Sequence, residues 1–417
     1  MDAKRERYTP NDVGPSPLEW KAPRLSEVST LITNGFVGTV TPFYTDITGV
    51  PYLYGTNVRA NKLETNEIRY VTREFHTAQS KTALKAGDLL TVQSGHIGET
   101  AVVTDQFHGA NCHALIVTRL KQEKADPHYL CFYVNSEIGR ARMKGLEVGS
   151  TILHINTKDL KKFRVLLPSL PEQKKIAQIL STWDKAISVT EKLLANSQQQ
   201  KKALMQQLLT GKKRLLDENG VRFSGEWCTC TLSEVAHIIM GSSPKSEAYN
   251  DNGLGLPLIQ GNADIKCRVS CPRVYTSDIT KECTPGDILL SVRAPVGTVA
   301  LSQHKACIGR GISAIKSKRK MSQSFLYQWF LWFEPKWCYL SQGSTFESIN
   351  SDDIKTLKLS VPNFEEQQKI AAVLSAADAE ISTLEKKLAC LRDEKKALMQ
   401  QLLTGKRRVK VDEAVAE

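Results

Sequence analysis

The chain has 417 residues, of which 41% are hydrophobic and 24% are charged, and its formal net charge at pH 7 is +12. This composition excludes a disordered chain, and at about 150 residues per domain the length predicts several folded units. No run reaches the roughly 18 apolar residues of a membrane span, and the start, MDAKRERYTPND, lacks a signal peptide's apolar stretch, so a cytoplasmic protein without a membrane partner is expected.

The charged residues and the cysteines set expectations about binding partners. Lys and Arg number 56 against 44 Asp and Glu, which favours a polyanion such as nucleic acid if the surplus is clustered and is otherwise incidental. The closest cysteine groupings, Cys228-x-Cys230 and Cys267-x3-Cys271, lack a second pair at zinc-ribbon spacing. Reduced structural thiols are therefore expected rather than a metal site.

The first half of the chain contains a region with strand character, followed by a long helix. Its segment EWKAPRLSEV begins at Glu19, and the run DLLTV from Asp88 is typical of a strand bounded by glycine. The segment YLCFYVNS from Tyr129 predicts a buried helix, whose aromatic residues are expected in the core rather than as base-stacking platforms. The triplet Gly-Ser-Thr at residues 149–151 precedes the long helix.

In the first long helix, steps of four and three join positions 176, 180, 183, 187, 190 and 194, all of which are apolar except Thr190. This spacing predicts a coiled-coil helix from about residue 172 to about residue 210. Pro168 and Pro171 precede its start, and Gly211, among lysines and an arginine, marks its end. At about 1.5 Å per residue the helix is a rod of about 58 Å.

The second half repeats this order with different variable segments. EWCTCTLSEV begins at Glu226, DILLSV at Asp287 and FLYQWFLWF at Phe325, and Gly-Ser-Thr returns at residues 343–345. A duplication of this length predicts two equivalent halves.

The helical segments are the most similar parts of the two halves. At an offset of 194, residues 167–187 match residues 361–381, and KKALMQQLLTGK at 201–212 returns without a change at 395–406. Two rods that each expose an apolar stripe should pack on one another, and an antiparallel pairing about a pseudo-twofold axis is expected.

These patterns predict an α+β protein with two globular domains separated by two long antiparallel coiled-coil helices. The expected parts, in chain order, are an N-terminal arm (1–16), a first domain (17–168), a first helix (169–214), a connector (215–226), a second domain (227–362), a second helix (363–408) and a C-terminal tail (409–417).

Sequence motifs of catalysis are missing. There is no Asp/Asn-Pro-Pro-Tyr/Phe motif for amine methylation, no Gly-x-Gly-x-x-Gly after a strand, and no local Ser-His-Asp or Cys-His signature. GKKR from Gly211 and GKRR from Gly405 lack the other residues of a phosphate loop, so helix capping explains them better. KDLK from Lys158 and DDIK from Asp352 are better explained as solvated helix starts than as nuclease sites. The sequence therefore favours binding over catalysis.

Together these features resemble the specificity subunits of type I DNA restriction-modification systems. The likeness covers nearly the whole chain. It rests on the repeated KKALMQQLLTGK with PEQKKIAQIL or EEQQKIAAVL before it, on Gly-Ser-Thr before each helix, and on the Leu-Ser-Glu-Val that opens each variable region. The resemblance implies a non-catalytic reader of double-stranded DNA with two target-recognition domains, each reading one half of a split, asymmetric sequence. The helices would form a spacer that docks two modification subunits.

The resemblance also implies where cofactors are bound. This chain would bind none. S-adenosylmethionine would lie on the modification subunits, which methylate adenine at N6, and ATP and magnesium on a separate restriction subunit. Two identical helix segments would serve two identical partner subunits, while the reading domains are free to diverge. Half-sites roughly one to one-and-a-half DNA turns apart, at about 34 Å per turn, would suit helices of this length.

Polar residues on loops beside the matched Gly-Asp strands are the candidates for DNA contact, because Arg, Lys, Asn and Gln read base edges and positive groups bind phosphates. These candidates are Asn57, Arg59, Gln93, His96, Asn111, Gln260, Asn262, Lys266, Arg293 and Arg310.

The candidates for partner docking lie on the helix faces, although some must form the internal seam instead. They are Gln173, Ile176, Leu180, Leu204, Leu208, Gln367, Ile370, Leu374, Leu398 and Leu402. The alternative function is a structural coiled-coil adaptor whose charge is incidental. A self-contained methyltransferase or nuclease has no supporting motif.

Overall fold

The computed structural model describes residues 8–9, 16–147, 153–337 and 348–411. The chain divides into two compact units: unit 1 comprises Met1–Thr190 and Lys387–Glu417, and unit 2 comprises Glu191–Lys386. Most of the N-terminal arm, both Gly-Ser-Thr triplets and the end of the tail fall outside the described residues.

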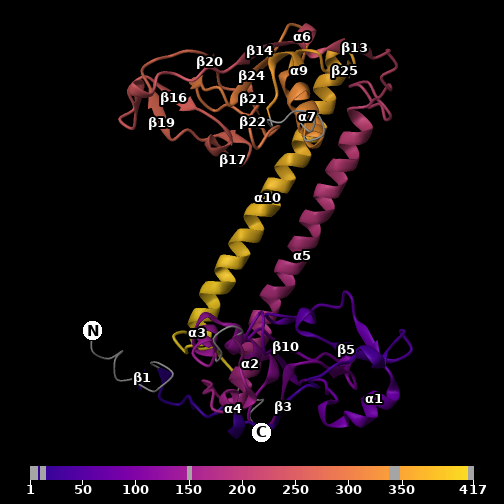
Figure 1. Cartoon of the computed structure of the whole chain (residues 1–417), viewed down its shortest axis with the longest axis vertical. Helices are drawn as coiled ribbons and strands as arrows, with labels where there is room; N and C mark the ends of the chain where they lie inside the picture. The colour runs from indigo at the N-terminus through magenta and orange to yellow at the C-terminus, as the bar shows by residue number, and fades with distance from the viewer. Residues whose placement is uncertain (1–7, 10–15, 148–152, 338–347, 412–417) are drawn as a thin grey trace. The chain divides into compact units, whose positions relative to one another are not determined.

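The two long helices are α5 (Leu170–Leu208) and α10 (Phe364–Leu402), each of 39 residues. Helix α5 begins in unit 1 and ends in unit 2, and α10 does the reverse (Figure 1). Each unit therefore contains one globular part, the start of one long helix and the end of the other.

Unit 1 has two four-stranded sheets, with strand orders β10-β9-β12-β3 and β11-β5-β8-β4. The strands of the first sheet are β3 (Ser29–Asn34), β9 (Leu89–Val92), β10 (Thr100–Val102) and β12 (Leu115–Leu120). Those of the second are β4 (Tyr44–Thr45), β5 (Val50–Leu53), β8 (Arg69–Val71) and β11 (Asn111–Cys112). Two further pairs are β1 (Tyr8–Thr9) with β2 (Ser16–Pro17), and β6 (Val58–Arg59) with β7 (Lys62–Leu63).

The first sheet of unit 1 is buried on both faces. Leu90 and Val117 pack into a core with Leu53 of the second sheet, whereas Leu89 and Ile116 face a core that includes the start of α5. Successive side chains of a strand point to opposite faces, so both faces must be apolar. This explains why the predicted strand DLLTV is almost continuously apolar, without polar alternation.

The short helices of unit 1 are α1 (Arg73–Ala78), α2 (Pro127–Asn135), α3 (Glu137–Lys144) and α4 (Thr157–Leu160). Asp126 caps α2 by accepting from the Tyr129 N–H, and Ser136 caps α3 by accepting from the Gly139 N–H. The prediction that YLCFYVNS is a buried helix is confirmed, because Tyr129 to Val134 are all buried.

Unit 2 repeats the arrangement with a six-stranded sheet, β14-β24-β21-β22-β18-β17, and a five-stranded sheet, β15-β19-β16-β23-β20. The strands of the first sheet are β14 (Ala236–Met240), β17 (Ile265–Lys266), β18 (Val269–Ser270), β21 (Ile288–Ser291), β22 (Val299–Leu301) and β24 (Ile312–Ser317). Those of the second are β15 (Tyr249–Asn250), β16 (Leu256–Ile259), β19 (Val274–Thr276), β20 (Glu282–Cys283) and β23 (Ala306–Ile308).

The remaining elements of unit 2 connect its sheets to the long helices. Strands β13 (Cys228–Thr231) and β25 (Lys358–Val361) form a two-stranded sheet, and the helices are α6 (Leu232–Val235), α7 (Gln323–Phe333) and α9 (Ser351–Lys355). Helix α7 corresponds to the predicted FLYQWFLWF helix and packs in one core with the start of α10.

Within each unit the two long helices run antiparallel. In unit 1 Asp184 of α5 pairs with Lys395 of α10, and further back toward the start of α5, Glu172 pairs with Arg408 beyond the end of α10. Three residues after each helix ends, a glycine has positive φ, 70° at Gly211 and 71° at Gly405, as the helix-stop signals predict. The predicted α+β class with two antiparallel coiled-coil helices is confirmed.

The part of the chain that the structure describes contains no helix that is both long enough and apolar enough to cross a membrane.

Candidate nucleic-acid interface and helix joints

Unit 2 brings polar side chains together where its only described parallel pair in the second sheet, β16 and β23, ends. The residues that follow two parallel strands are neighbours. Gln260 follows β16, and Arg310 lies between two glycines that follow β23. A Cβ at Gly311 would lie 2.3 Å from the carbonyl oxygen of Gln260. Glycine therefore allows these two loops to approach one another.

Arg293 reaches the same end of unit 2 from strand β21. The N–H of Val292, just before it, donates to the Gly311 carbonyl over 2.9 Å, and the Arg310 N–H donates to the Ser243 hydroxyl over 3.4 Å. Gln260, Arg293 and Arg310 are exposed. We call residues 241–245, 260–262, 292–296 and 309–311 the unit 2 loop end. Its two guanidinium groups can bind phosphates or the edge of guanine, and its amide can pair with adenine.

The corresponding end of unit 1 carries different chemistry. Tyr54 follows β5 and His113 follows β11, again a parallel pair, and their rings are 5.0 Å apart. Arg69 lies 5.2 Å from the Tyr54 ring centre and donates to the Tyr44 hydroxyl over 2.9 Å. Burial lowers the pKa of His113, which keeps its imidazole neutral at pH 7 and able to donate and accept hydrogen bonds. We call these four residues the unit 1 loop end.

Sequence reasoning missed all four residues of the unit 1 loop end. Tyr54 and His113 become neighbours only through the parallel pairing of β5 with β11, and no local sequence motif predicts this pairing. Of the predicted residues, Gln93 and His96 lie in the loop after β9, the counterpart of the loop that carries Arg293. His96 is exposed, and Gln93 is half-buried.

The structure corrects the prediction for Asn57 and Asn111, which support loops from inside. Asn57 is 3% exposed, and its amide accepts from the Tyr54 N–H and donates to two loop carbonyls. Asn111 is fully buried, and its amide bonds to the Thr82 hydroxyl, the Cys112 N–H and the Gln79 carbonyl. Because buried amides with satisfied hydrogen bonds are unavailable to DNA, we reassign both residues to the scaffold.

Arg59 and Lys266 occupy corresponding hairpins, and the Arg59 guanidinium donates to the carbonyl of Gly55, next to Tyr54, over 3.4 Å. The Arg59 guanidinium also donates to the Val58 carbonyl over 2.9 Å. The Lys266 hairpin joins the sheet beside Leu301 of β22, which pairs with Ile288, the first residue of β21. Arg293 lies at the other end of β21, two residues beyond its last residue, Ser291. Asn262 follows Gln260 by two residues and is half-buried at the unit 2 loop end. The structure thus groups Gln260, Asn262, Arg293 and Arg310 and leaves Lys266 apart.

The structure also corrects most of the predicted docking residues, because their side chains are inside the chain's own cores. Eight of them are at most 2% exposed: Gln173, Ile176, Leu180, Leu208, Gln367, Ile370, Leu374 and Leu402. Side chains this deeply buried stabilise the joint between helices and globular parts and cannot also form a partner surface. Leu204 and Leu398 are half-buried at the edges of these cores.

Gln173 and Gln367 have the same role in the two units. The Gln367 side chain accepts from the Ser322 N–H over 2.9 Å and donates to the Pro362 and Lys320 carbonyls. Gln173 makes the equivalent bonds to Asp126, Pro168 and Lys124. Each glutamine thus ties the start of a long helix to the cap of the aromatic helix α2 or α7.

An arginine after each long helix makes the second repeated joint. Arg214 makes a two-pronged ion pair with Glu366, both distances being 2.6 Å, and lies 5.8 Å from the Trp227 ring centre. These hydrogen bonds with Glu366 raise the pKa of Arg214. In unit 1, Arg408 pairs in the same way with Glu172 and lies 5.9 Å from Trp20. In each unit, the arginine after one long helix, the glutamate at the start of the other long helix and the tryptophan of the Glu-Trp segment therefore meet in one joint.

The two globular parts have related folds and are joined to the long helices by nearly identical contacts. This arrangement defines a class of protein with two related recognition domains. The sequence pattern of the type I restriction modification DNA specificity domain matches residues 17–196 and again residues 224–391. The chain belongs to this family of type I restriction-modification specificity subunits.

Individual relatives agree with this assignment. A putative type I restriction enzyme MjaX specificity subunit from Methanocaldococcus jannaschii is 32% identical over 98% of each chain. The MjaVIII specificity subunit of that organism is 26% identical over 70% of this chain and 74% of its own. The structure of the S subunit of a type I restriction-modification system from M. genitalium has a TM-score of 0.62 over 92% of this chain and 96% of its own, at 15% identity, and so supports the fold. A chain from a study of complex assembly in a type I R-M system has a TM-score of 0.58 at 25% identity, over 94% of this chain and 99% of its own.

Proposed function

We propose that this chain is a non-catalytic reader that gives a type I complex its DNA sequence specificity. Each loop end reads one half of a split target. The long helices carry two modification subunits, which bind S-adenosylmethionine and methylate adenine at N6, and through them the complex recruits restriction subunits that use ATP and magnesium. The observation that carries the proposal is the contrast within the repeat: the helix joints are the same in both units, whereas the loop ends differ in almost every side chain.

The difference between the loop ends supports an asymmetric target. The unit 2 loop end offers Gln260 and two exposed arginines, whereas the unit 1 loop end offers two tyrosines, Arg69 and a neutral His113 whose ring lies 5.0 Å from that of Tyr54. Arginine suits guanine and glutamine suits adenine, whereas tyrosine and neutral histidine donate and accept single hydrogen bonds. Two such different surfaces should read two different half-sites.

The direct test is a map of N6-methyladenine in cells that express the modification subunits with and without this chain. We expect one bipartite motif with a constant gap to be methylated only when the chain is present. An unchanged map in cells whose modification subunits are active would contradict the proposal and favour the coiled-coil adaptor.

Arg310→Ala is expected to weaken recognition of one half-site only. A well-placed arginine contact to a base contributes about 1–3 kcal/mol of discrimination, which is about 5- to 150-fold in affinity. The measurement is affinity for targets with substitutions in either half. Arg319→Ala is the matched control, because Arg319 is an exposed arginine beyond the opposite end of β24 and its loss changes the net charge equally. Equal effects of the two variants would show that Arg310 contributes only general charge.

DNA affinity is also expected to fall steeply with salt. A reader that contacts several phosphates releases the counterions bound to them, so its affinity should drop by orders of magnitude between about 50 and 200 mM salt. Titration of a labelled duplex with the complex at several salt concentrations measures this slope. A flat slope is the result that an adaptor with incidental charge would give.

A further inference from the structure

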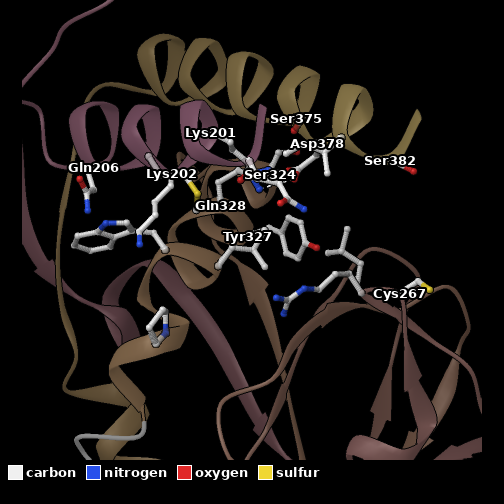
Figure 2. Close-up of a pocket in the computed structure, with 18 of the residues that line it drawn as sticks. Lys201, Lys202, Gln206, Cys267, Ser324, Tyr327, Gln328, Ser375, Asp378 and Ser382 are labelled. Atoms are coloured by element: carbon white, nitrogen blue, oxygen red, sulfur yellow. Dashed lines mark hydrogen bonds and ion pairs between the residues drawn. The ribbon is translucent and has the colours of Figure 1, made fainter. Parts of the chain in front are cut away.

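Unit 2 contains a groove of about 1200 Å³ between the end of α5, residues 375–385 in the middle of α10, and helix α7. Lys201, Lys202 and Gln206 line it from α5, and Tyr327 and Trp332 line it from α7. Figure 2 shows Lys202 extending from α5 into this space, beside the segment that carries Tyr327. These three residues of α5 belong to the segment KKALMQQLLTGK, which is repeated without a change, so unit 1 contains the same side chains at Lys395, Lys396 and Gln400.

The corresponding place in unit 1 is largely filled by the chain itself. Glu137, the first residue of α3, pairs with Lys396 over 2.7 Å, and Gln400 donates to the other carboxylate oxygen over 2.5 Å. The cavity that remains there is about 230 Å³. Hydrogen bonds from Lys396 and Gln400 lower the pKa of Glu137. In unit 1 the Lys-x3-Gln pair therefore binds a glutamate carboxylate at the start of a helix, in an ion pair whose lysine and glutamate side chains are 62% and 55% exposed.

One hydrogen bond that the two units share matches Lys336 with Glu137, whereas the helix caps Asp126 and Ser322 match Glu137 with Phe333. In this shared bond, Asn135 accepts from the Thr100 N–H, and Glu334 accepts from the N–H of Val299, the equivalent strand residue. Two residues beyond these acceptors lie Glu137 in unit 1 and Lys336 in unit 2. Lys336 lines the groove and its ammonium lies 3.6 Å from the centre of the Trp332 ring.

The other charges of the groove leave a cationic area around Lys202 and Lys336. Lys201 is paired with Asp378, which also accepts from Gln328 over 2.8 Å, and Arg268 is paired with Glu334 over 2.7 Å. The remaining acid, Glu385, lies seven residues beyond Asp378 on α10, about 10 Å further along the helix. Among the described residues, neither Lys202 nor Lys336 has a carboxylate partner within ion-pair distance.

We propose that this groove of unit 2 binds an acidic side chain at the start of a helix of the modification subunit, in the place that Glu137 occupies in unit 1. The inference rests on the proposed function, because it requires that modification subunits dock on the repeated helix ends. It goes further in making the two docking places unequal. The partner at unit 2 supplies the carboxylate that the chain supplies for itself in unit 1.

The test compares Lys202→Glu with Lys396→Glu in the full chain, with purified modification subunit as the probe and with native mass spectrometry and isothermal titration as readouts. Charge reversal at Lys202 should weaken one of the two docking events by tenfold or more, because a charge-assisted hydrogen bond is replaced by repulsion. Lys396→Glu, an identical change on an identical segment, should leave subunit affinity within about threefold. Lys336→Glu is a second variant that does not alter a long helix, and it should weaken the same docking event.

Each outcome bears on a different statement. Equal effects at Lys202 and Lys396, or no effect at Lys202, would overturn the unequal docking while leaving the proposed function intact. Loss of DNA affinity in the Lys202 and Lys336 variants with subunit binding unchanged would assign the groove to phosphates and overturn the inference as well. If the wild-type chain binds no modification subunit, the proposed function fails and the inference fails with it.

Discussion

Replacing Arg214 with methionine is expected to destabilise unit 2 by about 3–5 kcal/mol, because it leaves the carboxylate of Glu366 buried without a counter-charge. The Glu366 side chain is fully buried and receives two hydrogen bonds from Arg214. Removing one partner of a buried ion pair costs far more than the pair contributes relative to apolar residues. Hydrogen exchange of the amides at the start of α10 would measure the local loss, and urea denaturation would measure the global one.

Two comparisons sharpen this prediction. The double variant Arg214→Met with Glu366→Leu should recover most of the lost stability, since it removes the stranded charge together with its partner. Lys62→Met breaks the pair with Glu64, whose side chains are 67% and 34% exposed, and should cost less than about 1 kcal/mol. A double variant as unstable as the single one would mean that Arg214 acts through its packing on Trp227 rather than through its charge.

Gln367→Ala is expected to lower the free energy of unfolding by about 2–4 kcal/mol, because it leaves buried backbone groups without hydrogen-bond partners. The groups that lose their partner are the Ser322 N–H at the cap of α7 and the carbonyls of Pro362 and Lys320. Faster hydrogen exchange at the start of α7 should accompany the change, since this glutamine ties α7 to the start of α10. Differential scanning calorimetry would give the overall shift.

The neighbouring residue offers a matched control. Gln368 has the same side chain one position later on the same helix and is exposed, so Gln368→Ala should change stability by less than about 0.5 kcal/mol. Gln173→Ala should reproduce the effect in unit 1, where the same three bonds are made. If Gln367→Ala were no more damaging than Gln368→Ala, the glutamine joint would have no structural role.

Local physical chemistry made much of the fold readable from the sequence. The four-and-three spacing of apolar residues predicted both long helices, which begin and end within a few residues of the expected places. Gly211 and Gly405 marked their ends because a positive φ costs glycine little. DLLTV and DILLSV form strands, and the aromatic runs form buried helices. Each of these signals lies within a few residues of the structure that it specifies.

The site depended on contacts between distant residues, and there the sequence was a poorer guide. Asn57 and Asn111 are of a residue type that often contacts DNA, but their side-chain amides are hydrogen-bonded to backbone groups that come into reach only in the folded protein. Tyr54 and His113 meet only because two strands 59 positions apart pair in parallel.

The sequence by itself determined the repeat, the two helices, the sheet-forming segments and the membership of a family. The tertiary structure decided which of the repeated residues are internal joints, such as Gln173 and Arg408, and which remain exposed, such as Lys202. It also showed that identical segments have different surroundings, since Lys396 meets Glu137 whereas Lys202 faces an open groove. The physical reason is that helix periodicity and turn chemistry are encoded within a few residues, whereas burial and pairing depend on residues that the fold brings together from far apart.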